Sequence, residues 1–213
     1  MSLQDVHNMA KKTKEELDVS AEEKIKEAAR KVFTLKGYAA TRTRDIAEAS
    51  GINLALLNYY FRSKEKLFHV IMIEKIQKLF GVIIPIANDT NLALEIKIEL
   101  IVTNYIDLLL EHPDLPLFVF SEVRNNTEQF IHSTNADNLL RNSSLIKQIE
   151  LKKPDINPLH FLMSLLGMVV FPFIGKPVFT AAGILDEEIF QKLMNERKAL
   201  IPKWIKSMLE LEL

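Results

Sequence analysis

Two short, apolar-patterned segments that meet at Gly51 constrain the fold of this chain more than any other feature. The spacing of their apolar residues predicts helices over 43–50 and 54–60. Ala47, four positions before the glycine, is small at the point where the two helices would cross. The turn between them needs a backbone angle that a β-carbon resists, and glycine supplies it. This spacing predicts a helix-turn-helix, although other two-helix corners also satisfy it.

The two helices are expected to pack on each other and on a preceding helix. Ile46, Ile52 and Leu57 would form the contact. The outward face of the second helix carries side chains that can enter a major groove, namely Asn53, Leu54, Asn58 and Tyr59. We expect the preceding helix to begin at a capping box, Ser20 to Glu23, and to stop at Gly37.

The remainder of the chain also reads as helical. Six glycines and eight prolines are few for 213 residues, and favour long helices over strands and turns. We expect a helix over about 64–80, capped by Ser63 and ended by 81–85, and further helices over 92–111, 115–125, 137–152, 158–171 and 186–211. The predicted fold is all-α with about nine helices: a flexible arm (1–19), a three-helix DNA-binding domain (20–66), a connecting helix (64–80) and a helical domain (81–213).

Composition excludes several classes of protein. The chain has no cysteine, so disulfides and thiolate metal sites are excluded. Its five histidines lack metal-ligand spacing, and no catalytic motif appears, so we predict no metal, no cofactor and no enzymatic activity. The longest apolar stretch, 159–174, is interrupted by His160, Ser164 and Pro172, which disfavours a membrane span. These features predict a soluble cytoplasmic protein.

Charge is distributed unevenly along the chain. The net charge is −1, yet residues 20–80 contain eight Lys and four Arg against seven Asp and Glu. A basic segment on an otherwise acidic chain suggests one face directed at a polyanion such as DNA.

The residues around Gly51 extend into a longer motif. It comprises Gly37-Tyr38, Thr43-Arg-Asp-Ile-Ala-Glu-Ala-Ser-Gly-Ile52, Leu57-Asn-Tyr-Tyr-Phe61 and Ser63-Lys-Glu-Lys-Leu67. Over about residues 20–70 the chain resembles the TetR/AcrR family of transcriptional regulators. The resemblance implies a homodimer that binds double-stranded DNA at a palindromic operator.

The resemblance also implies a set of DNA-contacting residues. Arg42, Thr43 and Arg44 match backbone contacts at the start of the first short helix. Asn53, Leu54 and Ala55 stand where the family reads base edges, Tyr59 and Tyr60 where it touches phosphate, and Lys64 where it holds the DNA backbone. Asn58 departs from the family, in which many members have tyrosine; its amide can pair with an adenine edge or can merely lose a phosphate contact. Without the motif, Arg42, Arg44 and Lys64 would read as a solvated charged face.

For the C-terminal domain, the resemblance implies a cavity for a small apolar or amphipathic effector and a dimer interface. Candidate cavity residues, which could equally be plain core, are Asn104, Tyr105, Phe118, Phe120, Arg124, Phe130, His160, Phe161, Met163 and Met168. Candidate interface residues are Phe171, Phe190, Leu193, Met194, Leu200, Ile201, Trp204, Ile205 and Met208. Pro202 is expected to kink the last helix or restart it.

The function expected from these features is ligand-responsive regulation of transcription, most often repression in the resembled family. The alternative is a ligand-independent DNA-binding adaptor whose helical domain serves only to dimerise. A small-molecule enzyme is the least favoured class.

Overall fold

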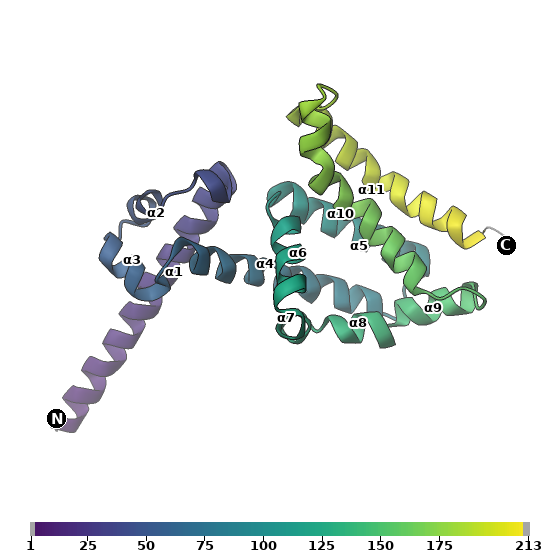
Figure 1. Cartoon of the computed structure of the whole chain (residues 1–213). Helices are drawn as coiled ribbons and strands as arrows, with labels where there is room; N and C mark the ends of the chain where they lie inside the picture. The colour runs from purple at the N-terminus through teal and green to yellow at the C-terminus, as the bar shows by residue number, and fades with distance from the viewer. Residues whose placement is uncertain (1–2, 211–213) are drawn as a thin grey trace. The chain divides into compact units, whose positions relative to one another are not determined.

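The computed structural model describes the backbone of residues 3–210, and the side chains of residues 21–210 except positions 138 and 140. In this part of the chain every regular element is an α-helix (Figure 1). The expected all-α class is therefore confirmed, with eleven helices in the described residues where about nine were expected. The chain divides into two compact units, one ending at Glu74 and the other beginning at Lys75.

The first unit contains α1 (Leu3–Ala40), α2 (Thr43–Ser50), α3 (Leu54–Phe61) and the beginning of α4 (Lys64–Asn88). α1 already begins at Leu3, so the expected helix start at Ser20 is wrong. The backbone of 3–19, where we expected an arm, is helical, and its flexibility stays a prediction. Gly37 interrupts α1 at φ 72° and ψ 167°, so the helical run breaks where the sequence predicted a stop.

A single apolar core holds these helices together. Six side chains in it are fully buried, namely Ile25, Ala29, Ile46, Leu57, Leu67 and Ile71. Ile25 and Ala29 of this set come from α1. Figure 1 shows α2 and α3 beside the second half of α1. At the edge of the core, Glu74 of α4 accepts from Lys26 at 3.2 Å and from Arg30 at 2.6 Å. Burial and this charge cluster together fix α4 on α1.

α4 is longer than the sequence predicted. Its start is capped as expected, because the Lys66 N–H donates to the Ser63 hydroxyl at 3.1 Å. Its end is not at 81–85: the helix continues through Pro85 to Asn88. Ile83 and Ala87 on this last stretch are buried, and their burial offsets the hydrogen bond that the proline removes. The boundary between the two units therefore lies inside α4, before residue 81, where the sequence analysis began the second domain.

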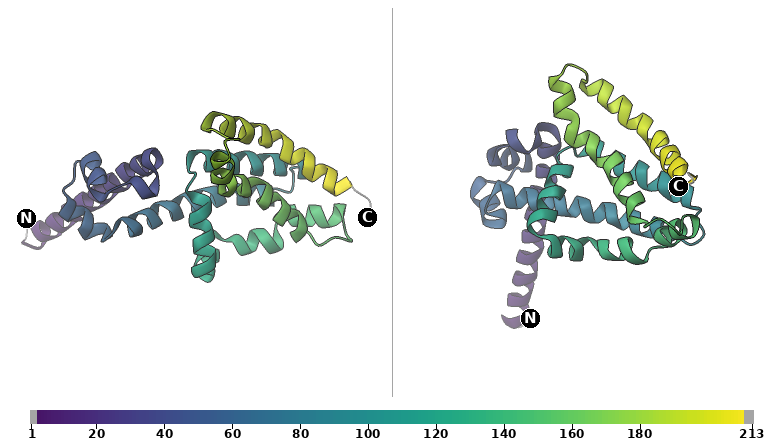
Figure 2. Two further views of the ribbon diagram at one scale, coloured as in Figure 1. Left: turned by 45° about the horizontal axis from the view of Figure 1, so that its top comes forward. Right: turned by 45° about the vertical axis from the view of Figure 1, so that its right-hand side comes forward.

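The second unit comprises the rest of α4 and seven further helices: α5 (Leu94–Glu111), α6 (Leu115–Asn125), α7 (Thr127–Thr134), α8 (Ala136–Asn142), α9 (Ser144–Lys152), α10 (Leu159–Ala181) and α11 (Glu187–Glu210). α11 packs along α5 and α10, as Figures 1 and 2 show. The core between α5 and α11 is apolar and closed, with Val102, Ile106 and Ile201 fully buried.

Two expected helix boundaries in this unit are wrong, and one suggested helix restart does not occur. The segment 137–152 forms two helices, because Ser143 leaves the helical conformation and caps α9 by accepting from the Ile146 N–H at 3.3 Å. α10 does not end at Phe171 but continues through two prolines. α11 likewise continues through Pro202 without a restart. In both of these helices, packing against the rest of the unit outweighs the unfavourable proline.

α10 is also the one helix of the described residues that is long and apolar enough to cross a membrane. The core helix of a soluble protein passes the same test, so a single case is weak evidence. α10 packs against α5, α6 and α11 of its own unit. No membrane is indicated by this arrangement.

Candidate nucleic-acid interface and effector hollow

The turn between α2 and α3 has the geometry that the sequence predicted. Gly51 caps α2 in the left-handed conformation, at φ 67° and ψ 18°. The Gly51 and Ile52 N–H groups donate to the carbonyls of Glu48 and Ala47, at 3.2 and 3.1 Å. A β-carbon at position 51 would meet no heavy atom within 4 Å, so glycine is needed here for its backbone angle and not for space. Ala47 itself is buried, as expected for the crossing point.

α3 buries one face and exposes the other. Leu57 and Phe61 point into the core. The exposed side chains on α3 and at its start are Asn53, Ala55, Asn58 and Tyr59, while Leu54 and Tyr60 are half-buried. The face that the sequence assigned to the major groove is thus the solvent face of a helix anchored in the core.

Asn53 has a structural role that the sequence analysis did not assign to it. Its side-chain Oδ1 accepts from the Leu56 N–H at 2.8 Å and caps α3. The capping signal was present in the sequence, because asparagine just before a helix is a preferred cap. With the oxygen occupied, the Nδ2 amide is the group that Asn53 can offer to a base.

The start of α2 gathers positive charge. Arg42 occupies the cap position, and its backbone N–H donates to the Asp45 carboxylate at 3.0 Å. Thr43 is the first helical residue. The Arg42 N–H and Lys36, 3.1 Å away, hold the pKa of Asp45 below its usual value. Arg42 and Arg44 are exposed and form no ion pair within the described residues, so both guanidinium groups can reach a polyanion.

Lys64, at the start of α4, is held inside its own unit. Its Nζ donates to the carbonyl oxygens of Tyr38 and Thr41, at 2.9 and 3.0 Å, and lies 4.2 Å from the centroid of the Tyr38 ring. No sequence pattern marks these partners, because they are backbone carbonyls that follow the break at Gly37. Two of its three protons are therefore used to hold the end of α1.

Two tyrosine rings and one further cation lie on or next to the exposed side of α3. The Tyr59 side chain is 75% exposed, and its ring meets the half-buried Tyr60 ring edge-on at 5.4 Å. Arg62, which the sequence analysis passed over, caps α3 with a positive φ of 58° and is exposed. It adds a cation at the end of α3.

The predicted cavity residues differ widely in exposure, and their role in binding a ligand stays a prediction. Phe130 and Phe161 are buried in the core, whereas Phe120, Arg124, His160 and Met163 are exposed; Asn104, Tyr105, Phe118 and Met168 are half-buried. Burial raises the pKa of the Tyr105 hydroxyl to about 12, and the Asn104 amide donates back to the Leu100 carbonyl of its own helix at 2.8 Å.

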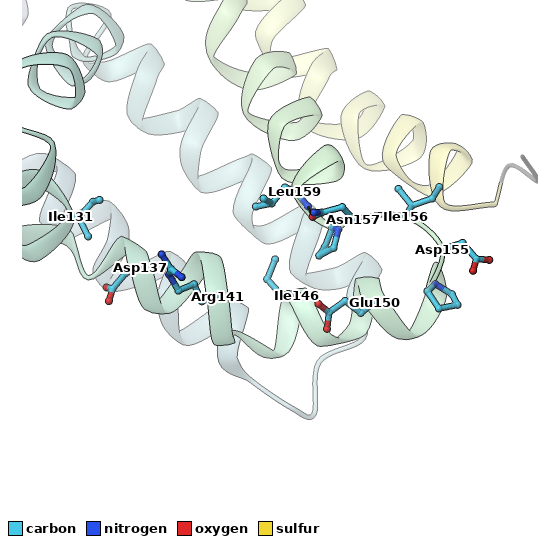
Figure 3. Close-up of a pocket in the computed structure, with 11 residues that line it drawn as sticks. Ile131, Asp137, Arg141, Ile146, Glu150, Asp155, Ile156, Asn157 and Leu159 are labelled. Atoms are coloured by element: carbon cyan, nitrogen blue, oxygen red, sulfur yellow. Dashed lines mark hydrogen bonds between the residues drawn. The ribbon is translucent and has the colours of Figure 1, made fainter.

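A hollow of about 780 Å³ lies elsewhere in the second unit. Figure 3 shows its two sides: Ile131, Arg141 and Ile146 come from α7, α8 and α9, and Asn157 and Leu159 face them from the segment that opens α10. Asp137, Glu150, Pro154, Asp155, Ile156 and Pro158 complete the lining. Six of its lining residues are apolar and five are polar, and the polar ones include charges of both signs. None of the ten predicted cavity residues lines this hollow.

A second hollow of about 860 Å³ lies along α10 and α11. Six of the residues expected at a dimer interface line it, namely Phe171, Phe190, Leu193, Met194, Leu200 and Trp204, together with Met168. Of the other three, Ile201 and Ile205 are buried and Met208 is half-buried. The six therefore line one hollow of the unit, four of them as exposed side chains.

Comparisons with known proteins agree with the resemblance found in the sequence. Residues 25–71 match the family described as bacterial regulatory proteins, tetR family. The chain is 25% identical over 202 residues to a probable HTH-type transcriptional regulator, YttP, of Bacillus subtilis (strain 168), covering 90% of this chain and 95% of that one.

Two solved structures share the fold. One is a transcriptional regulator of the TetR/AcrR family from Thermobifida fusca, with a TM-score of 0.62 and 18% identity over 85% of this chain and 96% of that one. The other is the regulator FadR from Bacillus subtilis in complex with stearoyl-CoA, with a TM-score of 0.54 and 17% identity over 83% and 95%.

Proposed function

We propose that this chain, a TetR-family transcriptional regulator that binds DNA, acts as a homodimeric repressor. The dimer binds a palindromic operator and dissociates from it when a small ligand binds. The observation that carries the proposal is the exposed face of α3, held on a buried core next to the left-handed Gly51. Such a face is a recognition helix by position and by exposure. We place the protein in the cytoplasm, where the DNA is.

On this proposal the first unit divides its contacts between bases and backbone. Asn53, Leu54, Ala55 and Asn58 read base edges, the first through its free Nδ2 amide. Arg42, Thr43, Arg44, Tyr59, Tyr60 and Lys64 contact phosphates, with the N–H groups at the start of α2 assisting. Lys64 contributes through the one proton that its two carbonyl partners leave. The exposure of Arg42, Arg44 and Tyr59 supports this assignment.

The second unit is proposed to dimerise through the hollow along α10 and α11. Large apolar side chains stand open to solvent there: Phe171 is 61% exposed, and Leu193 and Trp204 are each 39% exposed. Exposed apolar surface of this extent favours association. A twofold dimer presents two copies of α3 to half-sites about one helical turn, roughly 34 Å, apart.

The effector is proposed to occupy the hollow of about 780 Å³ between α7, α8, α9 and the start of α10. Its six apolar and five polar lining residues suit an amphipathic molecule, and its volume lies within the range of known ligand pockets. That a protein of the same fold is known with stearoyl-CoA bound supports a ligand in this class of domain. The ligand weakens DNA binding by preferring a conformation that the operator does not.

The DNA-binding half of the proposal is tested with fragments selected from the source genome. We expect specific binding in which affinity falls on the order of 10³-fold between 50 and 200 mM salt, since three cations per subunit meet phosphate. Replacing Arg42 and Arg44 by Ala should reduce both affinity and salt dependence, whereas Arg124→Ala, an exposed arginine of the second unit, should not. Absence of salt-dependent binding to any fragment contradicts the proposal.

The ligand half needs a separate experiment. Stearoyl-CoA is the first probe, followed by neutral and charged amphiphiles, with the melting temperature and operator release as readouts. Ile131→Trp fills part of the hollow and should abolish both effects while DNA binding persists. If no probe releases the operator, the chain is a ligand-independent adaptor.

A further inference from the structure

Two opposite charges lie in the otherwise apolar hollow along α10 and α11. Glu196 and Arg197, neighbours on α11, line it together with Phe171, Leu193, Trp204 and other apolar side chains. Neighbouring residues of a helix point about 100° apart, so their side chains do not face each other. No ion pair joins them, although both belong to the same surface.

Arg197 is fixed in place and incompletely paired. Its Nη2 donates to the Met168 carbonyl at 2.7 Å, and its Cζ lies 5.1 Å from the centroid of the Trp204 ring. Burial lowers the pKa of its guanidinium. Its Nε is buried and has no hydrogen-bond partner in the described part of the chain. A cation held this way in an apolar surface calls for an anion from outside the protomer.

Glu196 carries the negative charge that could pair with such a guanidinium. It is exposed at the hollow, and within the described residues it takes part in no hydrogen bond or ion pair. The charges of this surface are therefore one free carboxylate beside one underpaired guanidinium.

We propose that Glu196 of each protomer pairs with Arg197 of the other when two copies join across this hollow. A twofold interface is self-complementary: if position 196 contacts position 197, the reverse contact forms as well. One acid and one base on the same surface then produce two ion pairs and leave no buried charge unmatched. The pairing rests on the proposed homodimer. The two ion pairs would fix how the two protomers align and would favour a second copy of this chain over other partners.

A pair of charge reversals tests the pairing. Glu196→Lys places two cations opposite each other twice in a homodimer, and Arg197→Glu places two anions opposite each other twice. We expect each variant alone to dimerise at least about tenfold more weakly than the wild type in sedimentation equilibrium, because like charges oppose each other across the interface. Mixed together, the two variants should form a heterodimer, because all four charges are then matched.

Matched controls lie on the same helix. Glu188→Lys and Lys192→Glu make the same changes of charge at exposed positions of α11 that do not line the hollow. Both should dimerise like the wild type. Arg197→Glu also loses the bond to Met168, so circular dichroism checks its fold; Glu196→Lys keeps that bond and decides the question alone if the other variant unfolds.

The outcomes separate this inference from the proposed function. If the wild type is a dimer and Glu196→Lys dimerises equally well, the ion pair is wrong and the homodimer stands. If mixing restores no dimer from two folded variants, the reciprocal pairing is likewise overturned. A monomeric wild type at all concentrations overturns both the homodimer and the pairing.

Discussion

The ammonium of Lys64 lies 2.9 Å from the carbonyl oxygen of Tyr38 and 4.2 Å from the centroid of the same residue's ring. A second bond, to the Thr41 carbonyl, completes the contact. The lysine thereby joins the start of α4 to the segment between α1 and α2. A residue that the sequence assigned to DNA alone thus also positions the DNA-binding helices.

Lys64→Ala should therefore destabilise the protein as well as weaken DNA binding. Hydrogen bonds from a charged donor contribute about 1.5–3 kcal/mol, so we expect a loss of this order in urea unfolding. Operator and random DNA should lose affinity about equally, and the salt dependence should flatten if the third proton meets phosphate. An unchanged salt dependence with reduced stability would mean that Lys64 is structural only. Lys66→Ala, exposed on the same turn, is the control.

The capping role of Asn53 can be separated from its proposed reading of a base. Serine also caps helices, so Asn53→Ser should keep the stability of the protein while losing the Nδ2 donor. Asn53→Ala should lose both, at about 1 kcal/mol in unfolding free energy. We expect both variants to change base preference at the same operator position, measured by selection from a randomised operator. Unchanged preference in the serine variant would remove Asn53 from the base-reading residues.

The helices of the first unit could be predicted from the sequence because the residues that determine them lie close together along the chain. Gly51, Ala47 and the apolar residues around them lie within a few positions of each other, and each is read from one helix turn. α2 matches its predicted bounds, and α3 extends one residue further. The contacts of Lys64 could not be predicted in this way, because its partners are two backbone carbonyls more than twenty positions earlier in the chain. No side-chain pattern marks a backbone acceptor.

The second unit was predictable in class but not in detail. Aromatic and methionine residues at helical spacing were expected to line a cavity, yet Phe130 and Phe161 are core. Both uses require the same residue types, so spacing alone does not distinguish them. Six of the predicted interface residues line one hollow along α10 and α11, and their place in a dimer interface stays a prediction. A seam on one helix face is a local pattern, whereas a cavity depends on how several helices pack.

A buried histidine in the second unit predicts a pH dependence of stability. His112, at the end of α5, is only 6% exposed, and the Lys75 ammonium lies 3.1 Å from its Nδ1. Burial, with Lys75 and Lys78 nearby, lowers the pKa of His112 to about 4, which the Glu111 carboxylate only partly opposes.

The direction of the effect follows from linkage. The unfolded chain takes up a proton at His112 near its ordinary pKa of about 6.5, before the folded chain does. The contribution of the neutral, buried His112 to the free energy of unfolding is therefore complete above that pH and is lost as the pH falls toward 4. Urea unfolding between pH 7 and 5 should show this slope in the wild type and less of it in His112→Gln. Equal slopes in the two proteins would contradict a neutral buried imidazole.

A contact from α11 explains why α10 tolerates Pro172. Pro172 has no N–H, so the carbonyl of Met168, four residues earlier, loses its helical donor. Arg197 of α11 donates to that carbonyl at 2.7 Å and replaces the missing bond. The proline and the arginine are thus two halves of one arrangement, although they lie on different helices.

A double-mutant cycle measures this dependence. Arg197→Met leaves the Met168 carbonyl without a partner and should cost about 1–3 kcal/mol in unfolding free energy. In a Pro172→Ala background the backbone supplies the bond again, so the same change should cost less by about 1 kcal/mol or more. The stacking of Arg197 on Trp204 is lost in both backgrounds and cancels in the cycle. A coupling energy near zero would show that Arg197 holds α10 and α11 together by packing alone.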